Sequence, residues 1–256
     1  MSNQSKATPK IILIGIPDNN STFKKKFVLS LLAVITTAQT WAQQMKEKLD
    51  KDIEIRLCLA DMGWVDSMRN SVAKSAIEQD AYAIMWLDSD MTFPPDIIPR
   101  FYQILSQNEV DAVTGLYTYK YPPYLPHVYT SKTKEGRLRY AKNFPLNEIF
   151  PVSAAGFGCL MMKTECLKRV KKPYFRAKIE DGKLVLGEDF DFCDRAKLKI
   201  LLDPITSCGH VTDCAYSMRD YIESNGLKIK NHVIQVSDEQ QKKIMEKHTV
   251  DKPKKV

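Results

Sequence analysis

The fold is decided by one stretch of the sequence, Tyr82-Ala83-Ile84-Met85-Trp86-Leu87-Asp88-Ser89-Asp90. Its apolar part, residues 82–87, has the length and side-chain types of a buried strand. Two prolines follow at 94 and 95 and turn the chain, because proline cannot donate to a strand ladder. Two carboxylates spaced by one residue at a strand end can share a divalent cation that bridges to substrate phosphates. Taken alone, the triplet is equally compatible with a solvated turn.

Strand and helix patterns alternate through the first half of the chain. This alternation predicts an α/β fold with a largely parallel sheet and right-handed crossovers. Ligands of such sheets bind beyond the carboxyl ends of the strands, which is where Asp88 and Asp90 lie. Ser21 and Ser67 are expected to cap the first two helices. The predicted strands are 11–16, 53–59, 82–87 and 112–117, and the predicted helices are 23–49, 67–79 and 96–106.

The second half is less regular. Residues 118–150 are rich in Tyr, Pro and Lys and contain a hairpin-like turn at 134–137, so both an acceptor-facing flap and an irregular loop remain open. A helix is expected over 164–170, and Asp191 is expected to cap another that runs through Arg195. No linker divides the chain. We therefore predict a single domain over 10–225, with a flexible N-terminus at 1–9 and a mobile basic extension at 226–256.

The composition is that of an ordinary soluble protein. The chain has 256 residues, 44% hydrophobic and 27% charged, which argues against global disorder. Its formal charge of +7 permits an anionic partner such as a nucleotide, a nucleic acid or a lipid headgroup. The segment 24–35 imitates a signal peptide, but a strand precedes it and its apolar part is too short to span a bilayer. We expect a cytoplasmic protein without a stable membrane anchor.

The six cysteines are dispersed and form no C-x-x-C pair, which is typical of reduced core residues. Cys208, His210 and Cys214 are close enough in sequence to suggest zinc. However, the second cysteine pair of a zinc finger is missing.

Several motifs occur in an order that resembles one enzyme family. They are Pro17 with Asn20, Arg69-Asn70, Trp86-Leu87-Asp88-Ser89-Asp90, Gly187-Glu188-Asp189-Phe190-Asp191-Phe192-Cys193, and Gly209-His210. In this order they resemble the motifs of nucleotide-sugar-dependent glycosyltransferases of the GT-A fold, most closely the family-2-like enzymes. The resemblance covers residues 10–215, and the general look of the chain is similar to enzymes of phages and large viruses, whose location would be the host cytoplasm. It implies a Rossmann-like, mixed and mostly parallel sheet flanked by helices.

The resemblance implies a metal and a nucleotide-sugar donor. Asp90 inherits the role of ligand to Mn²⁺ or Mg²⁺, and Asp88 that of facing the ribose or a metal-bound water. His210 would complete the metal site and favour Mn²⁺, although a satisfied loop histidine is the alternative. The cation would stabilise charge on the leaving diphosphate.

Further residues are implied in donor binding. Arg69 offers a planar guanidinium for a phosphate or a base carbonyl, and Ser89 lies between the two aspartates. Pro17 and Asp61 are candidates for a uracil pocket, which makes a UDP-sugar the expected donor. The turn at 61–64 departs from the aspartate-rich turn of the family, so the base remains open. Gly156, in Ala154-Ala155-Gly156-Phe157-Gly158, would permit close approach to the donor sugar or acceptor, or would simply form a turn.

Asp189 is the expected catalytic base. Inverting transfer needs a carboxylate that takes the proton of the acceptor hydroxyl, and Glu188 would orient Asp189 or act in its place. The alternative is that both are ordinary charges in the first turn of a helix. Inversion is the expectation, but retaining enzymes of this fold share the other motifs.

The acceptor is left open by the sequence. The basic surplus and the aromatic residues 117–129 suit hydroxymethylated pyrimidines in DNA, since phosphates attract lysines and a flipped base can stack on a ring. Glycan, lipid and protein acceptors are alternatives. A nucleotidyltransferase is less favoured, because the turn at 15–20 lacks a phosphate loop rich in glycine and basic residues. A non-catalytic nucleotide- or carbohydrate-binding protein is the third possibility. The sequence makes no prediction of oligomeric state.

Overall fold

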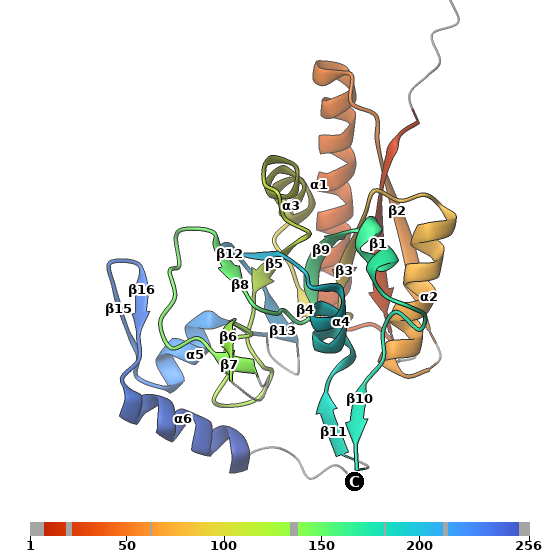
Figure 1. The fold of residues 1–256 in the computed structure, drawn as a ribbon. Coiled ribbons are helices and arrows are strands. Elements are labelled where there is room, and N and C mark those ends of the chain that lie inside the picture. Colours follow the sequence, from red (N-terminus) through yellow and green to blue (C-terminus); the bar gives the residue numbers. More distant parts are fainter. Residues whose placement is uncertain are drawn as a thin grey trace, which may run out of the picture.

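A seven-stranded mixed sheet forms the centre of the molecule (Figure 1). The computed structural model describes residues 8–18, 22–61, 63–133, 138–181, 183–211 and 215–250. The strand order is β2-β1-β3-β9-β5-β12-β8; β1 pairs in parallel with β2 and β3, and β5 with β12. Strand β9 is antiparallel to β3 and β5, and β8 to β12. The bounds are β1 Lys10–Pro17, β2 Ile53–Ala60, β3 Ala83–Leu87, β5 Ala112–Leu116, β8 Phe150–Val152, β9 Cys159–Lys163 and β12 Ile200–Ser207.

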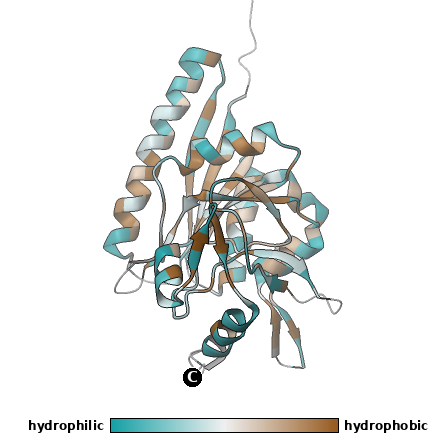
Figure 2. Ribbon diagram, turned by 90° about the vertical axis from the view of Figure 1, so that its left-hand side faces the viewer, coloured by the Kyte–Doolittle hydropathy of each residue, from teal (hydrophilic) through white to brown (hydrophobic). Residues whose placement is uncertain are grey.

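Helices cover both faces of this sheet. Successive side chains of a strand point to opposite faces, and β1 feeds both cores in this way. Ile12 and Ile14 pack with α1 (Lys25–Leu49) and α3 (Ile97–Gln107), whereas Ile11 and Leu13 pack with α2 (Val65–Glu78). Figure 2 shows the hydrophobic residues concentrated in the central strands. The predicted strands and helices of the first half are thus confirmed, with ends shifted by one or a few residues.

The predicted helix caps are wrong. Helix α2 begins at Val65, so Ser67 lies within its first turn, and Trp64 at the N-cap position makes no side-chain cap. Helix α1 begins at Lys25 after Lys24, and Ser21 lies outside the described residues. Both helices are held by packing of their apolar faces, which outweighs the small contribution of a missing cap.

Short strands and helices make up the second half. The strands β6 and β7 are antiparallel, and the turn at 134–137 between them lies outside the described residues. The predicted helix at 164–170 is a 3-10 helix, η1 (Thr164–Arg169). The other bounds are β4 Met91–Thr92, β6 Tyr129–Lys132, β7 Leu138–Tyr140, β10 Lys178–Glu180, β11 Lys183–Leu186, α4 Glu188–Ala196, β13 Gly209–Val211, β14 Ala215–Tyr216 and α5 Met218–Ser224.

Asp191 does not cap α4. Gly187 occupies the N-cap position, and Asp191 lies in the first turn, where its carboxylate accepts a hydrogen bond from Arg195 Nε at 2.5 Å. This pair lies one turn apart on the same helix face. Asp191 therefore stabilises α4 through its ion pair with Arg195 rather than as an N-cap.

The described part of the predicted C-terminal extension packs on the domain. It forms β15 (Lys228–Lys230), β16 (Val233–Gln235) and α6 (Asp238–Val250). Leu227, Ile234, Val236 and Ile244 are buried in the same apolar cluster as α2 and α4. Lysine-rich composition pointed to a solvated tail, whereas these spaced apolar side chains bring the segment onto the core.

The dispersed cysteines are expected from the sequence to be reduced residues of the core. Those that the structure describes are thiols, and four of them are buried. In the described ranges, no helix has both the length and the apolar character needed to cross a membrane.

Candidate functional site

The carboxyl ends of β1, β2 and β3 meet at one edge of the sheet. Ser89 Oγ, just beyond β3, donates to Asp18 Oδ1, just beyond β1, at 2.7 Å. The Asp18 amide donates in turn to the carbonyl of Ala60, the last residue of β2. Ser89 and Pro17 thus lie at the predicted edge. The buried Asp18, which sequence reasoning did not select, links the three turns.

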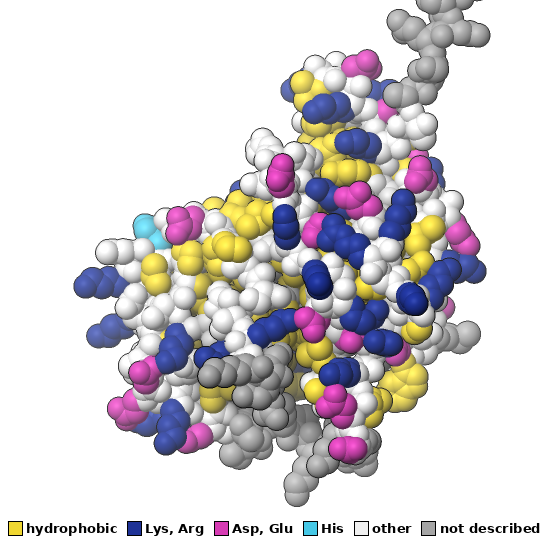
Figure 3. Space-filling view, in the orientation of Figure 1, with side chains coloured by type: hydrophobic (Ala, Val, Ile, Leu, Met, Phe, Trp, Pro, Cys, Tyr) yellow, Lys and Arg dark blue, Asp and Glu magenta, His cyan; other side chains and the backbone are white. Residues whose placement is uncertain are grey.

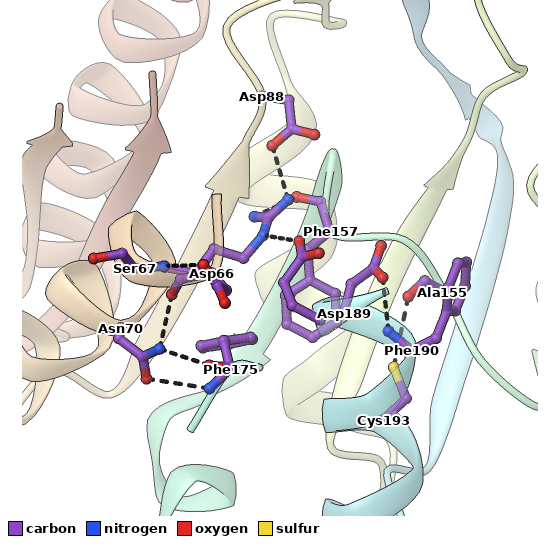
Figure 4. Close-up of polar contacts among 12 residues, drawn as sticks. Asp66, Ser67, Asn70, Asp88, Ala155, Phe157, Phe175, Asp189, Phe190 and Cys193 are labelled. Atoms are coloured by element: carbon purple, nitrogen blue, oxygen red, sulfur yellow. Dashed lines mark hydrogen bonds and ion pairs between the residues drawn. The ribbon is translucent and has the colours of Figure 1, made fainter. Parts of the chain in front are cut away.

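Arg69 joins two of the predicted carboxylates, of which Figure 4 labels Asp88. It is 2% exposed on α2, and its Nη2 donates to Asp88 Oδ1 at 3.0 Å while its Nε donates to Glu188 Oε1 at 2.9 Å. The guanidinium also lies 5.5 Å from the ring centre of Trp86 and 5.7 Å from that of Phe157. Burial works against the charged form of Arg69, but the carboxylates of Asp88 and Glu188 outweigh it and raise the pKa of Arg69. Arg69 therefore orients both carboxylates, and direct contact with a donor stays a prediction.

Asp88 is a half-buried carboxyl with a perturbed pKa. Burial raises the pKa of Asp88 above its usual value, and the positive charge of Arg69 opposes this rise. The Asp88 amide donates to the carbonyl of Gly158 at 3.0 Å. A Cβ at Gly158 would lie 2.7 Å from Met91 Sδ and 3.2 Å from Asp88 Oδ2, so a side chain there would displace Met91 and crowd this carboxylate. Gly158 thus belongs to the site, although sequence reasoning selects only Gly156 from this motif.

Asp189 lies in the first turn of α4, beside Glu188. Its Oδ1 accepts the amide of Phe190 at 2.7 Å, and its Oδ2 would lie 3.3 Å from a Cβ placed on Gly156. Burial, reinforced by the Glu188 carboxylate, raises the pKa of Asp189 to about 7, while Arg69 opposes the rise. A carboxyl with a pKa near neutrality is suited to accept a proton in one step and release it in the next.

Gly156 fits a space that no side chain can share. A Cβ there would lie 2.4 Å from Tyr117 Oη and 3.5 Å from His127 Nδ1. Tyr117 is buried and stacks on His127 with ring centres 4.7 Å apart, so the ring cannot retreat easily. The Gly156 backbone therefore lies close to these rings and to Asp189, while its predicted approach to a donor sugar or acceptor stays a prediction.

Replacing Gly156 by alanine is expected to lower the free energy of unfolding by about 1–3 kcal/mol, because the new methyl overpacks the Tyr117 hydroxyl. Urea denaturation measures this loss. The same substitution in a Tyr117→Phe background should cost less, since the clashing oxygen is gone. An equal loss in both backgrounds would contradict the assigned contact.

Asp90 and His210 face each other at the end of the three-stranded sheet β4-β13-β14. The Val211 amide donates to the Asp90 carbonyl at 2.7 Å, and His210 Nε2 lies 4.0 Å from Asp90 Oδ1. His210 Nδ1 hydrogen-bonds the carbonyl of Thr118. A carbonyl only accepts, so Nδ1 carries the proton and the Nε2 lone pair is left for another partner. Backbone carbonyls commonly accept the other ring N–H of a metal-binding histidine and so fix its orientation.

The donor set fits a cation that also takes oxygens from a ligand. Among the described residues, no three His, Cys, Asp or Glu side chains gather as a metal site. Asp88, predicted as a third ligand, pairs with Arg69 through Oδ1, and its role as a ligand stays a prediction. Asp90 and His210 would supply two ligands, a number that suits Mn²⁺ or Mg²⁺ completing its coordination with phosphate and water oxygens; their role as metal ligands stays a prediction. Cys208, one of the residues that suggested zinc, is buried with its Sγ 3.3 Å from Cys159 Sγ. Cys214, another of them, lies outside the described residues.

Lys120 was not predicted. Its Nζ donates to Asp90 Oδ2 at 2.9 Å. Lys120 lies in the segment rich in Tyr, Pro and Lys, where no local pattern separates it from the other lysines. Asp61 is exposed beyond β2, and its role in a base pocket stays a prediction.

The tyrosines of this segment pack on one another. Tyr119 Oη lies 3.3 Å from Tyr129 Oη and accepts from Tyr140 Oη at 3.1 Å. His127 lies against both Tyr117 and Tyr119. These rings therefore pack on one another beside Gly156, whereas Tyr121 is 49% exposed.

No family model matches the chain, and no curated protein matches its sequence. Among solved structures, it is similar to A197 from STIV, with a TM-score of 0.54 and 19% identity over 90% of this chain and 95% of that one. Looser matches include GalNAc-T7 with UDP, GalNAc and Mn²⁺ (TM-score 0.47, 11% identity, 88% of this chain and 49% of that one). Another is the catalytic domain of Drosophila β1,4-galactosyltransferase 7 in complex with xylobiose (TM-score 0.42, 14% identity, 80% and 71%). The strand arrangement and the likeness to A197 confirm the expected fold class, a mixed α/β domain with a mostly parallel central sheet of the GT-A type.

Proposed function

We propose that the protein is a metal-dependent, inverting glycosyltransferase that uses a nucleotide-sugar, most simply a UDP-sugar. One observation carries this proposal: Arg69 binds both Asp88, after β3, and Glu188, which is 119 residues from Arg69 in the sequence. Two motifs that resemble those of the family, and that are far apart in the sequence, are thereby joined through the buried guanidinium of Arg69. The neighbouring Asp189 lies next to the Gly156 backbone at the same place.

The proposed chemistry divides between two carboxylates. Asp189 takes the proton of the acceptor hydroxyl as that oxygen forms a bond to the anomeric carbon of the sugar. The bond between that carbon and the diphosphate oxygen breaks, and its electron pair leaves with the diphosphate. A bound divalent cation supplies charge stabilisation to the leaving diphosphate. Asp90 and His210 would hold that cation, and Arg69 keeps Glu188 in position beside the base.

Hydroxymethylated pyrimidine in DNA remains our proposed acceptor, with glycan, lipid and protein acceptors as alternatives. The formal charge of +7 supports it. Figure 3 shows Lys and Arg side chains on the displayed face interspersed with Asp and Glu rather than gathered in one stripe. Tyr121 is exposed for stacking on a base, while Tyr117 and Tyr129 are buried. Charge therefore supports a DNA acceptor more than the tyrosine rings do.

A donor screen tests the function. Nucleoside diphosphate release is measured with Mn²⁺ and a panel of UDP-, GDP- and TDP-sugars, each with hydroxymethylated duplex DNA, glycans or peptides as acceptor. Transfer from one donor, with inversion at the anomeric carbon, is the expected result. Tight binding of a nucleotide-sugar without turnover on any acceptor would instead indicate a non-catalytic binding protein. Release of a sugar 1-phosphate in place of a nucleoside diphosphate would indicate a nucleotidyltransferase, which breaks the bond between the two phosphates.

The pH dependence of transfer is expected to show an acid limb near pH 7. Asp189 acts as a base only when ionised, and its pKa is raised to about 7, so kcat/KM should fall tenfold per pH unit below that value. The free energy of unfolding has the opposite pH dependence. Because folding raises the pKa of Asp189, this carboxyl stabilises the fold at pH values below the pKa of an ordinary carboxyl. That stabilisation is lost as the pH rises through about 7. Asp189→Asn should therefore flatten the pH dependence of urea stability. An acid limb near pH 4 would contradict the assignment.

A further inference from the structure

Asp90 has two neighbours that a metal ligand would not usually share. Lys120 Nζ lies 2.9 Å from Asp90 Oδ2, and His210 Nε2 lies 4.0 Å from Asp90 Oδ1. The histidine presents a lone pair, whereas the lysine presents a positive charge. One carboxylate thus faces a group that binds cations and a group that is itself a cation.

Both neighbours are positioned by the same segment. The carbonyl of Thr118 accepts the hydrogen bond from His210 Nδ1, and Lys120 follows two residues later. The amide of Tyr119 donates to the carbonyl of Leu125 at 2.9 Å, and that of His127 to the carbonyl of Tyr117 at 2.9 Å. The backbone that carries Lys120 is therefore fixed, and its ammonium reaches Asp90 through a long side chain.

A divalent cation and the Lys120 ammonium both need the lone pairs of Asp90, and they repel each other at short range. We propose that Lys120 competes with the divalent cation for Asp90, and that the diphosphate of the donor draws Lys120 away. The cation and the donor then bind cooperatively. The donor removes the lysine that opposes the cation, and the cation frees that lysine to bind the diphosphate of the donor. The identity of the donor in this inference rests on the proposed function; the competition at Asp90 rests on the contacts alone.

The Lys120–Asp90 pair is placed for exchange. The Lys120 side chain is 40% exposed and that of Asp90 30%. Water therefore screens the two charges, and the ion pair is weak. The lysine stem is flexible and its ammonium is easily rehydrated. The pair therefore breaks without disturbing the core, in contrast to the buried contacts of Arg69.

Binding of Mn²⁺ alone tests the competition. Free Mn²⁺ is followed by electron paramagnetic resonance during titration of the wild-type protein and of Lys120→Met. The variant should bind Mn²⁺ about fivefold more tightly or better, since the competing ion pair is gone. Lys120→Arg, which keeps the charge, should remain near wild type. Lys142→Met is the matched control, because Lys142 forms an ion pair with Asp238 between exposed side chains.

UDP serves as the probe of cooperativity. In the wild type, saturating UDP should tighten Mn²⁺ binding by a larger factor than in Lys120→Met, where no lysine remains to be displaced. Equal Mn²⁺ affinities of wild type and Lys120→Met, or no Mn²⁺ binding by either, would overturn the inference. Asp90→Asn separates the two proposals: if it abolishes Mn²⁺ binding while Lys120→Met has no effect, the metal site stands and the competition fails. Tighter binding in Lys120→Met without sugar transfer by the wild type would uphold the competition and overturn the proposed function.

Discussion

Asp189→Asn should lower kcat for sugar transfer by about 10²- to 10⁴-fold, which is the usual contribution of a general base. Asparagine preserves the shape of the side chain and still accepts the Phe190 amide hydrogen bond that Asp189 Oδ1 accepts at 2.7 Å. It cannot take a proton from the acceptor hydroxyl. The loss should therefore appear in kcat, while the affinity for the nucleotide-sugar changes little. Initial rates of nucleoside diphosphate release at saturating donor measure the effect.

Two further variants separate the base from its surroundings. Glu223→Gln is the matched control, because Glu223 is exposed and pairs only with the exposed Arg219; it should retain wild-type kcat. Glu188→Gln weakens the charge-assisted bond from Arg69 and should have an intermediate effect. If Glu188→Gln abolishes transfer and Asp189→Asn does not, the base is Glu188 and our assignment is wrong.

Arg69→Met is expected to lower the free energy of unfolding by about 3–5 kcal/mol. Removing one partner of a buried ionic group leaves the other charges without compensation. Here the two carboxylates that lose their partner are Asp88 and Glu188, both bound by the 2% exposed Arg69. Urea denaturation at pH 7.5 measures the loss, which should shrink as the pH falls and the carboxyls become protonated.

Arg219→Met provides the control for removal of an arginine charge. Arg219 pairs with Glu223 on the surface of α5, and such exposed helix pairs contribute about 0.3–0.5 kcal/mol. Arg69→Lys keeps the charge but loses the forked geometry, so it should fall between wild type and Arg69→Met. A loss for Arg69→Met no larger than that for Arg219→Met would contradict the central place given to this guanidinium.

The sequence predicts those parts of the fold that local pattern encodes. Strand β3 is found because six consecutive apolar residues end at Asp88, and the alternation of strands and helices gives the sheet class. Helix starts are missed because α1 and α2 use no side-chain cap. The segment after 225 is misjudged because its lysines are more conspicuous than Leu227 and Ile234, whose burial depends on tertiary packing.

The site is predicted less evenly than the fold. Motifs select Asp88, Asp189 and Arg69, but they predict that Arg69 contacts the donor, whereas its guanidinium binds Asp88 and Glu188. Its partners could not be derived, because the 119 residues between Arg69 and Glu188 are bridged only by the folded sheet. Lys120 is missed for the same reason: its contact with Asp90 depends on how an irregular segment packs.

Cation-dependent cleavage of the donor, with Asp90 holding the cation, is the central step of the proposed function. The measurement is release of nucleoside diphosphate from the best nucleotide-sugar of the screen, with and without Mn²⁺, in the wild type and in Asp90→Asn. We predict turnover by the wild type that requires Mn²⁺, and a loss of at least about 100-fold in Asp90→Asn, which is the scale expected when a group that stabilises the transition state is lost. Wild-type turnover that is unchanged by chelation of Mn²⁺ and by Asp90→Asn would contradict this prediction.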